Sequence, residues 1–397
     1  MGPLLATRDR FPILATSTYL INNSLGAMPE DAEAGRARYA REWRELGVRA
    51  WAEHWWSLGD RVADQVAPIL GAPSGSVSMQ PSTTVATATF LSCLRPSGSR
   101  RRIVTTELQF PSILYLTESW CRAHAAELIV VPKSHRYGTD LEALLSVIDD
   151  DVLAVVVSHV EFATAWINEA EALARHCRLH GARLLLDVFQ SAGVLPLELE
   201  AWGVDAAVGG CLKWLCGGPG NAFLYVDPRI ADELEPTLTG WLAHQAPFAF
   251  EPPPMRFRDG GSRFLNGTPQ IAALYAAGPG LEIIRKYGIH AIRSKSKDLG
   301  TLLCEQARSR GLELACTTDP DARGGTVTLD VPHAEGVARE LADRAVIVDY
   351  RPGYGLRIAP HFYNTAKECL HCLAQIEAIL ADGSWARHRG VSGTAPT

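Results

Sequence analysis

The sequence predicts an α/β fold with a mostly parallel central sheet, followed by a smaller α+β domain. Between residues 102 and 226, short runs rich in apolar and β-branched residues alternate with stretches of helical period. Strands that are buried on both faces and separated by amphipathic helices are typical of parallel sheets. A segment rich in proline, glycine and arginine at 251–264 interrupts this alternation, and the pattern after it is different.

The first half can be assigned element by element, because its strands and helices differ in hydrophobic period. Strands are expected at 101–107, 126–133, 152–160, 182–189, 204–210 and 221–227. Helices are expected at 110–127, 139–148 and 168–181. In a sheet of this kind, ligands bind at the carboxyl ends of the strands.

After the interruption, the pattern indicates a second domain in which long helices and short strands are mixed. Helices are expected at about 269–287 and 290–310, strands at 311–317, 325–331 and 345–351, and a closing helix at 364–380. We therefore divide the chain into an N-terminal arm (1–30), a large domain (31–255), a small domain (256–385) and a loose tail (386–397).

Composition excludes several classes of protein. Of the 397 residues, 47% are hydrophobic and 21% charged, as in a globular protein, and the net charge of −6 gives no general attraction to nucleic acid or anionic membranes. Nine scattered cysteines favour reduced thiols over a disulfide framework. The N-terminus lacks the apolar run of a signal peptide, and no stretch approaches the roughly 20 apolar residues of a membrane span. We expect a cytoplasmic protein.

Two charged residues stand where a ligand is expected. Asp187 ends the apolar run 182–189, and Lys213 follows one strand later in an uncharged stretch of glycine, cysteine, leucine and tryptophan. Each has an ordinary explanation, a structural hydrogen bond for Asp187 and an outward-pointing side chain for Lys213. Together they suit pyridoxal phosphate (PLP), whose aldehyde forms a Schiff base with a lysine and whose ring nitrogen is kept protonated by a carboxylate.

A PLP site also needs a phosphate cradle and an aromatic side chain on the ring. Ser82, Thr83 and Thr84 precede an apolar helical run, and hydroxyls with free N–H groups at a helix start bind anions. Phe110 follows a strand end and is the candidate for the ring face. Taken alone, the first would be an ordinary helix cap and the second a core residue.

Ordered motifs through nearly the whole chain resemble fold-type I, class V aminotransferase-family enzymes, and within that class kynureninases. They are NSLG (23–26), FPS (110–112), SHV (158–160), GGPG (217–220), GW (240–241) and RIAPHFYN (357–364). The resemblance implies a fold-type I PLP transferase with a mostly parallel seven-stranded sheet. It also implies a homodimer with shared active sites that acts on a small amino-acid substrate.

The resemblance implies roles for particular residues. Lys213 would be the Schiff-base lysine and Asp187 the partner of the pyridine nitrogen, while Arg357 would bind the substrate carboxylate with its guanidinium fork. An interface salt bridge is the alternative for Arg357, and helix packing the alternative for Trp51 as a pocket residue. The other implied cofactor and substrate contacts are Thr83, Thr84, Phe110, Ser158, Gln190, Asn23 and, from the partner subunit, Trp241, Asn266 and Thr268.

Three positions depart from the kynureninase pattern. Leu212 stands where kynureninases have tyrosine, Ile113 where they have aspartate, and Gln190 where they have histidine. Leucine cannot relay a proton, whereas glutamine can still hydrogen-bond the 3′ oxygen of the cofactor, as in related cysteine desulfurases. Because loss of a general acid typically costs a factor of about 10² to 10⁴ in rate, poor kynureninase activity is expected.

Four functions stay open at this point. The first is β-elimination at Cβ of an amino acid with release of a thiol, a reaction for which S-conjugated cysteine in antibiotic assembly is a substrate suggested by analogy. The second is true kynureninase, with His159 or Tyr363 as a replacement proton relay. The third is an aminotransferase or decarboxylation-coupled deaminase, and the fourth an inactive scaffold.

The cysteines offer two weaker hypotheses. Cys369 and Cys372 have metal-like spacing but lie in an amphipathic helix without a second such pair, so core packing is favoured and no metal is expected. Cys211 and Cys216 flank Lys213, and a persulfide carrier there is conceivable but is disfavoured beside the lysine.

Overall fold

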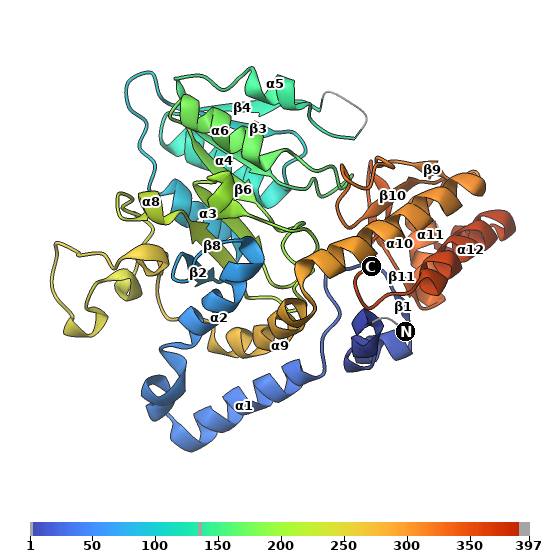
Figure 1. Cartoon of the computed structure of the whole chain (residues 1–397), viewed down its shortest axis with the longest axis horizontal. Helices are drawn as coiled ribbons and strands as arrows, with labels where there is room; N and C mark the ends of the chain where they lie inside the picture. Colours follow the sequence, from blue (N-terminus) through green and yellow to red (C-terminus); the bar gives the residue numbers. More distant parts are fainter. Residues whose placement is uncertain (1–2, 134–136, 389–397) are drawn as a thin grey trace.

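The computed structural model describes residues 3–133 and 137–388. Its centre is a seven-stranded sheet in which only β8 runs antiparallel to its neighbours, and this confirms the predicted fold class (Figure 1). Among the described residues, no helix combines the length and apolarity that a bilayer crossing requires. The strands, in spatial order, are β2 (Val77–Gln80), β8 (Ala222–Val226), β7 (Ala206–Gly210), β6 (Arg183–Asp187), β5 (Val152–Ser158), β3 (Arg102–Thr106) and β4 (Glu127–Val131).

Alternate residues of the central strands enter two different cores, which explains why these strands read as continuous apolar runs. In β6, Leu184 and Leu186 face the core that contains α6 (Ala170–Leu179), whereas Leu185 faces the core that contains α3 (Thr83–Leu91) and α4 (Pro111–Ala123). Each buried leucine contributes about 1.5–3 kcal/mol to folding. The remaining short helices of this domain are α5 (Leu141–Leu145), α7 (Leu199–Trp202) and α8 (Pro228–Ala231).

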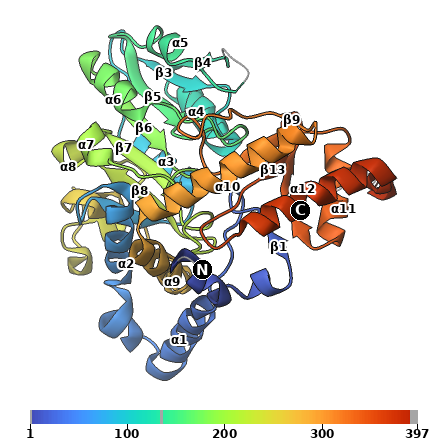
Figure 2. The same cartoon turned by 45° about the vertical axis from the view of Figure 1, so that its right-hand side comes forward.

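The small domain has its own core and its own four-stranded antiparallel sheet. Its helices α10 (Ile289–Ser309), α11 (Ala334–Asp343) and α12 (Ala366–Asp382) cover that core, and α10 leads to it from the large domain (Figure 2). The expected strand at 345–351 is divided into β11 (Val346–Ile347) and β12. The sheet order is β12 (Asp349–Arg351), β13 (Gly355–Ile358), β10 (Val327–Asp330) and β9 (Glu313–Leu314).

The N-terminal arm is fixed to the small domain. β1 (Thr18–Tyr19) pairs in parallel with β11, and Leu20 lies in the small-domain core. Arg8 forms an ion pair of 2.9 Å with Glu368 on α12. The arm therefore crosses from the small domain to the lysine-bearing loop, which it contacts through its NSLG segment.

Helix α9 (Ile271–Tyr287) packs against α1 (Asp31–Leu46) and α2 (Leu58–Val66), and its apolar face belongs to the core of the large domain. The boundary expected at residue 256 rested on composition, which does not report packing partners. From the packing, we propose that the small domain starts with α10.

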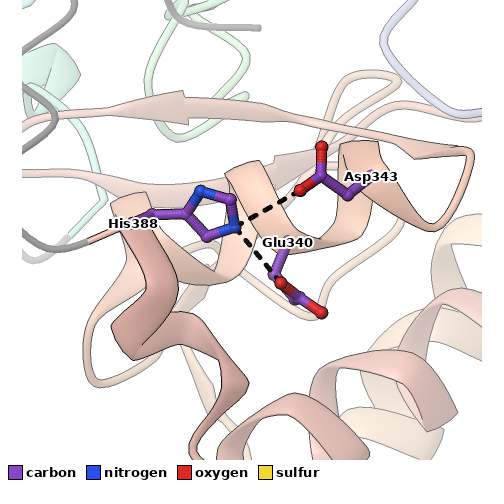
Figure 3. Close-up of side chains that lie close together, drawn as sticks. All are labelled: Glu340, Asp343 and His388. Atoms are coloured by element: carbon purple, nitrogen blue, oxygen red, sulfur yellow. Dashed lines mark hydrogen bonds and ion pairs between the residues drawn. The ribbon is translucent and has the colours of Figure 1, made fainter.

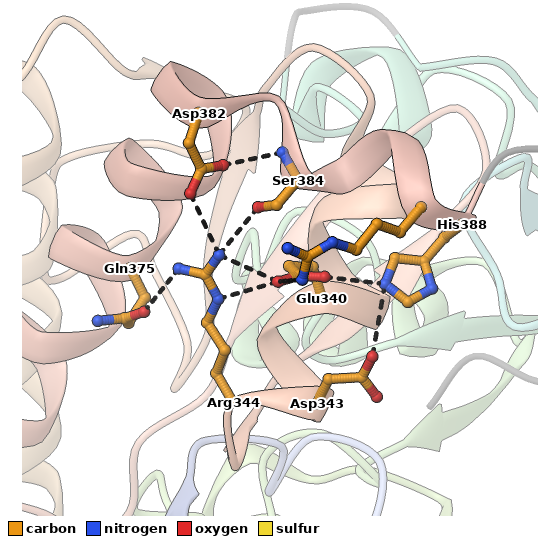
Figure 4. A network of polar contacts seen from close by, with 8 residues as sticks. Glu340, Asp343, Arg344, Gln375, Asp382, Ser384 and His388 are labelled. Atoms are coloured by element: carbon orange, nitrogen blue, oxygen red, sulfur yellow. Dashed lines mark hydrogen bonds and ion pairs between the residues drawn. The ribbon is translucent and has the colours of Figure 1, made fainter.

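The expected loose tail is ordered at its start. A short 3₁₀ helix, Ser384–His388, packs on α11, and His388 Nε2 lies 3.2 Å from Glu340 Oε2 and 3.6 Å from Asp343 (Figure 3). Glu340 also binds the guanidinium groups of Arg344 and Arg387, in a network that extends to Asp382 and Ser384 (Figure 4). Because Glu340 is already bound by two arginines, we interpret this cluster as a tether for the C-terminal segment. The rest of the expected tail, 389–397, lies outside the described residues.

Candidate active site

Asp187 and Lys213 meet at the carboxyl edge of the sheet. Asp187 is the last residue of β6, and Lys213 lies in the loop after β7; their exposed fractions are 6% and 8%. Burial raises the pKa of Asp187, against the opposing effects of the Phe189 N–H at 2.9 Å and of Lys213. Burial lowers the pKa of Lys213. The charges of Arg357 and Arg351 lower it further, whereas Asp187 opposes the shift. A lysine whose pKa is lowered has more of the neutral amine that attacks an aldehyde.

Two phenyl rings lie near the Lys213 amine. Its Nζ is 5.6 Å from the ring centre of Phe110, the predicted ring-face residue, and 4.1 Å from that of Phe189. Phe110 is placed there as the residue that caps α4, just before Pro111 at the first helical position. The ring of Phe189 lies against Gly210, where an added Cβ would be only 2.2 Å from Cε2. Sequence reasoning missed Phe189, although its position two residues after Asp187 was a usable signal.

The start of α3, where an anion site is expected, lies beside the strand that leads to Lys213. Ser82 caps this helix by accepting a hydrogen bond from the Val85 N–H at 3.2 Å, and Thr83 donates to the carbonyl of Gly209 at 3.3 Å. Gly209 belongs to β7, so the helix start lies beside the strand that leads to Lys213. Thr84 is exposed. The free N–H groups and hydroxyls here suit a phosphate.

The NSLG segment packs directly on the lysine loop. The Gly26 N–H donates to the carbonyl of Leu212 at 2.8 Å, and a Cβ on Gly26 would lie 2.1 Å from the Lys213 carbonyl oxygen. Asn23 is 1% exposed, and neither polar atom of its side chain has a hydrogen-bond partner among residues 3–133 and 137–388. Buried amides are rarely left unpaired, so this side chain fits a site completed by a bound molecule.

Gln190 and Ser158 are held largely by the protein. The side chain of Gln190 donates to the Asn23 carbonyl at 3.0 Å and accepts from the Trp214 indole at 3.1 Å. One N–H of Gln190 remains for the expected bond to the cofactor. The Ser158 hydroxyl donates to Gln109, whose own amide nitrogen is buried and has no partner in the part of the chain that the structure describes.

Arg357 lies in the site and is also part of an internal ion pair. It is 2% exposed on β13, binds Asp349 on β12 and donates to the Phe162 carbonyl, while its Nε has no partner within the described chain. Arg351 holds the other oxygen of Asp349 at 2.7 Å. Arg357 thus has an ion-pair partner within its own sheet, and a substrate carboxylate would share this guanidinium with Asp349.

Four predicted residues lie in other parts of the described chain. Trp51 stacks on Trp56, with ring centres 4.4 Å apart, and Trp56 in turn contacts Trp241 edge-to-face at 5.5 Å. Asn266 and Thr268 line a cavity of about 320 Å³ between β2 and the start of α9, whose lining does not include Lys213 or Asp187. Trp51 thus packs on its helical neighbours, and its role as a pocket residue stays a prediction.

The departures from the kynureninase pattern leave no proton carrier at their positions. Ile113 is buried in the core between α4 and the sheet, and Leu212 is half-buried with its carbonyl bound to Gly26. Burial lowers the pKa of His159 to about 4, and its ring packs edge-to-face on Trp202. The Tyr363 hydroxyl, the other replacement considered, donates to Asn22 and accepts from the Ala27 N–H at 3.1 Å.

The cysteines of the lysine loop are buried. Cys211 is fully buried and Cys216 is 3% exposed, and burial raises the pKa of each thiol to about 12. A persulfide carrier needs an accessible thiolate, so these thiols are unsuited to that role. Cys369 and Cys372 lie in the core of the small domain, as favoured from the sequence.

Comparison with known proteins assigns the chain to a family. Residues 33–366 match the aminotransferase class-V family. Kynureninase from Burkholderia pseudomallei is 33% identical over 88% of this chain and 85% of its own length, and kynureninase from Pseudomonas fluorescens is 32% identical over 97% and 94%.

Solved structures share the fold at lower identity. An apo cysteine desulfurase from Thermococcus onnurineus NA1 superposes with a TM-score of 0.84 at 20% identity, over 95% of this chain and 98% of the other. The cystine C-S lyase C-DES, in complex with its product cysteine persulfide, gives 0.84 at 20% identity over 92% and 98%. With the buried lysine, the carboxylate and the anion cradle at one sheet edge, the chain belongs to the aminotransferase class-V family and is a PLP-dependent, kynureninase-like enzyme.

Proposed function

We propose that the enzyme cleaves a bond at Cβ of an α-amino acid by β-elimination, with S-substituted cysteines as substrates and a thiol as leaving group. The observation that carries this proposal is that the site has the residues for binding PLP but lacks the proton-transferring residues of kynureninases. The lysine, carboxylate and anion cradle are present, whereas positions 212, 113 and 190 carry none of the proton-transferring groups that hydrolysis of a ketone needs.

Each residue has a role that follows from its surroundings. Bound PLP supplies an electron sink for the pair left at Cα. Lys213 would hold PLP and accept the Cα proton of the substrate. Asp187 would keep the ring nitrogen of PLP protonated, and the start of α3 would hold the phosphate of PLP. Arg357 would bind the substrate carboxylate, because its fork matches two carboxylate oxygens and Asp349 keeps it oriented.

We further propose a homodimer in which Trp241, Asn266 and Thr268 complete the site of the other subunit. What supports this is that Asn266 and Thr268 line one cavity with Trp56, which contacts Trp241. Trp56 and Trp241 belong to an aromatic cluster that continues into the exposed Phe248 and Phe250. Exposed aromatic clusters of this kind mark interaction surfaces. A cytoplasmic location and a setting in antibiotic assembly remain predictions from the sequence.

Kynureninase is the second candidate, because the identity of 33% to such enzymes extends over most of the chain. The two reactions release different products. The PLP-loaded enzyme would be mixed separately with S-ethyl-L-cysteine and L-kynurenine, and free thiol, pyruvate and anthranilate measured, with Lys213→Ala as the inactive control. Thiol and pyruvate from the first substrate support elimination. Anthranilate release without thiol release would refute it.

A further inference from the structure

The loop after β5 carries a buried carboxyl group that no role above uses. Glu161 is 1% exposed, and its position is set by backbone bonds from its N–H to Trp166 and from Ala165 to its carbonyl, of 2.8 and 2.9 Å. Oε1 accepts a hydrogen bond from Asn168 at 2.8 Å, and Oε2 has no partner among the described residues. A buried carboxylate in this state is costly, whereas a neutral carboxyl needs fewer partners.

The charges around Glu161 favour the neutral form. Asp187 at the end of β6 and Tyr354 in the β12–β13 turn are the titratable groups that face it, and no arginine or lysine of the described chain forms an ion pair with it. Burial and Asp187 raise the pKa of Glu161 to about 8, although the Asn168 hydrogen bond opposes this. The group therefore holds a proton at neutral pH.

The residues beside Glu161 reach the reaction site. Phe162, the next residue, places its ring edge-to-face on Phe110 at 5.4 Å, and its carbonyl binds Arg357. Ser158, three residues earlier, is the register partner of Asp187. His159 packs on Trp202 and Tyr363 donates to Asn22, whereas Oε2 of Glu161 has no partner among the described residues.

We propose that Glu161 is the general acid that protonates the leaving group, a role that rests on the elimination proposed above. The Cα proton passes to the Lys213 amine, the Cβ–S bond breaks with its electron pair going to sulfur, and the Glu161 O–H proton passes to that sulfur, giving a thiol. Lys213 is left protonated and Glu161 ionised. Transfer of one proton between them through water restores both. The acid and an alkyl thiol have similar pKa values, which is the condition for efficient proton transfer.

Leaving-group dependence tests this role in the PLP-loaded enzyme. A nitrophenyl thiolate leaves without protonation and an ethyl thiolate does not. Glu161→Gln keeps the size of the side chain and removes the transferable proton. We expect kcat/KM to fall about 10²- to 10³-fold with S-ethyl-L-cysteine and less than about tenfold with S-(nitrophenyl)-L-cysteine. Glu340→Gln, which alters a buried glutamate of the C-terminal tether, should change neither value by more than about twofold.

A second measurement detects the proton on Glu161 from the pH dependence of protein stability, without catalysis. In the ligand-free protein, the pKa of Glu161 is raised from 4.5 to about 8, so the folded state retains a proton that the unfolded state releases. Stability of the unmodified protein should therefore fall relative to Glu161→Gln as pH rises from 5 to 8. A pH-independent difference, or equal loss of activity on both substrates, would overturn the role of Glu161. Failure of the unmodified enzyme to release thiol from either substrate would instead refute elimination, and the acid's role with it.

Discussion

Replacement of Asp349 by asparagine should destabilise the enzyme strongly, because it removes the charge that compensates a buried guanidinium. Asp349 is fully buried and Arg357 is 2% exposed, and the two side chains are in direct contact across β12 and β13. Removing one partner of such a pair leaves an uncompensated charge, at a cost of about 3–5 kcal/mol. The lower end is expected here, since asparagine retains one hydrogen-bond acceptor and Arg357 keeps the Phe162 carbonyl.

Urea unfolding followed by circular dichroism would measure this loss. A fall of about 3 kcal/mol is a large part of a typical stability of about 5–15 kcal/mol. The KM for the amino-acid substrate should also rise, because Arg357 loses the partner that orients it. Glu335→Gln, which breaks an exposed pair with Arg339, is the matched control and should cause no measurable change. If Asp349→Asn lost less than about 1 kcal/mol, the argument that this buried pair is needed would be refuted.

Three further predictions follow from the site. Phe189→Ala should weaken PLP binding by about threefold to tenfold, the value of one aromatic stacking contact, and a visible-absorbance titration that shows unchanged affinity would contradict its placement beside Lys213. Gly26→Ala places a Cβ 2.1 Å from the Lys213 carbonyl oxygen, so cofactor loading and Tm should both fall, whereas Gly59→Ala, where a Cβ meets no atom within 4 Å, should leave both unchanged. His361 is 1% exposed, and its Nε2 lies 2.7 Å from the Trp214 carbonyl oxygen. Burial lowers the pKa of His159 to about 4 and of His361 to about 3, so the unfolded state binds protons that the folded state does not, and stability should fall as pH drops from 6.5 towards 4. For His361→Gln, the free energy of unfolding measured with urea should depend less steeply on pH over this range. An unchanged pH dependence would mean that His361 is not buried in its neutral form.

Much of the large domain was predictable because its information is local. Strands β5 and β6 are continuous apolar runs, and burial on both faces of a parallel sheet requires such runs. Asp187 and Lys213 could be placed at one edge because the carboxyl ends of parallel strands coincide there. The small domain was predicted less well. The strands expected at 311–317 and 345–351 contain β9 and β11, but these have only two residues each, too few for a hydrophobic period to fix their bounds, and β13 was not predicted.

Residues whose role depends on distant partners were missed or incompletely described. Asp349 and Arg357 are eight positions apart, but their contact arises from the register of β12 against β13. The N-terminal arm has no pattern that reveals its pairing with β11, because a two-residue parallel strand is specified by its partner.

The sequence by itself determined the fold class and the cofactor, and it predicted that Asp187 and Lys213 lie at one edge of the sheet, since these depend on short apolar runs and on motifs in a fixed order. Only the tertiary structure decided which carboxyl groups carry charge. The local sequence does not distinguish the carboxyl groups of Glu161 and Asp349. In the structure, an amide and another acid lie near Glu161, whereas two arginines lie beside Asp349. Protonation follows the solvent and charge around a group, and those are supplied by segments far apart in the chain.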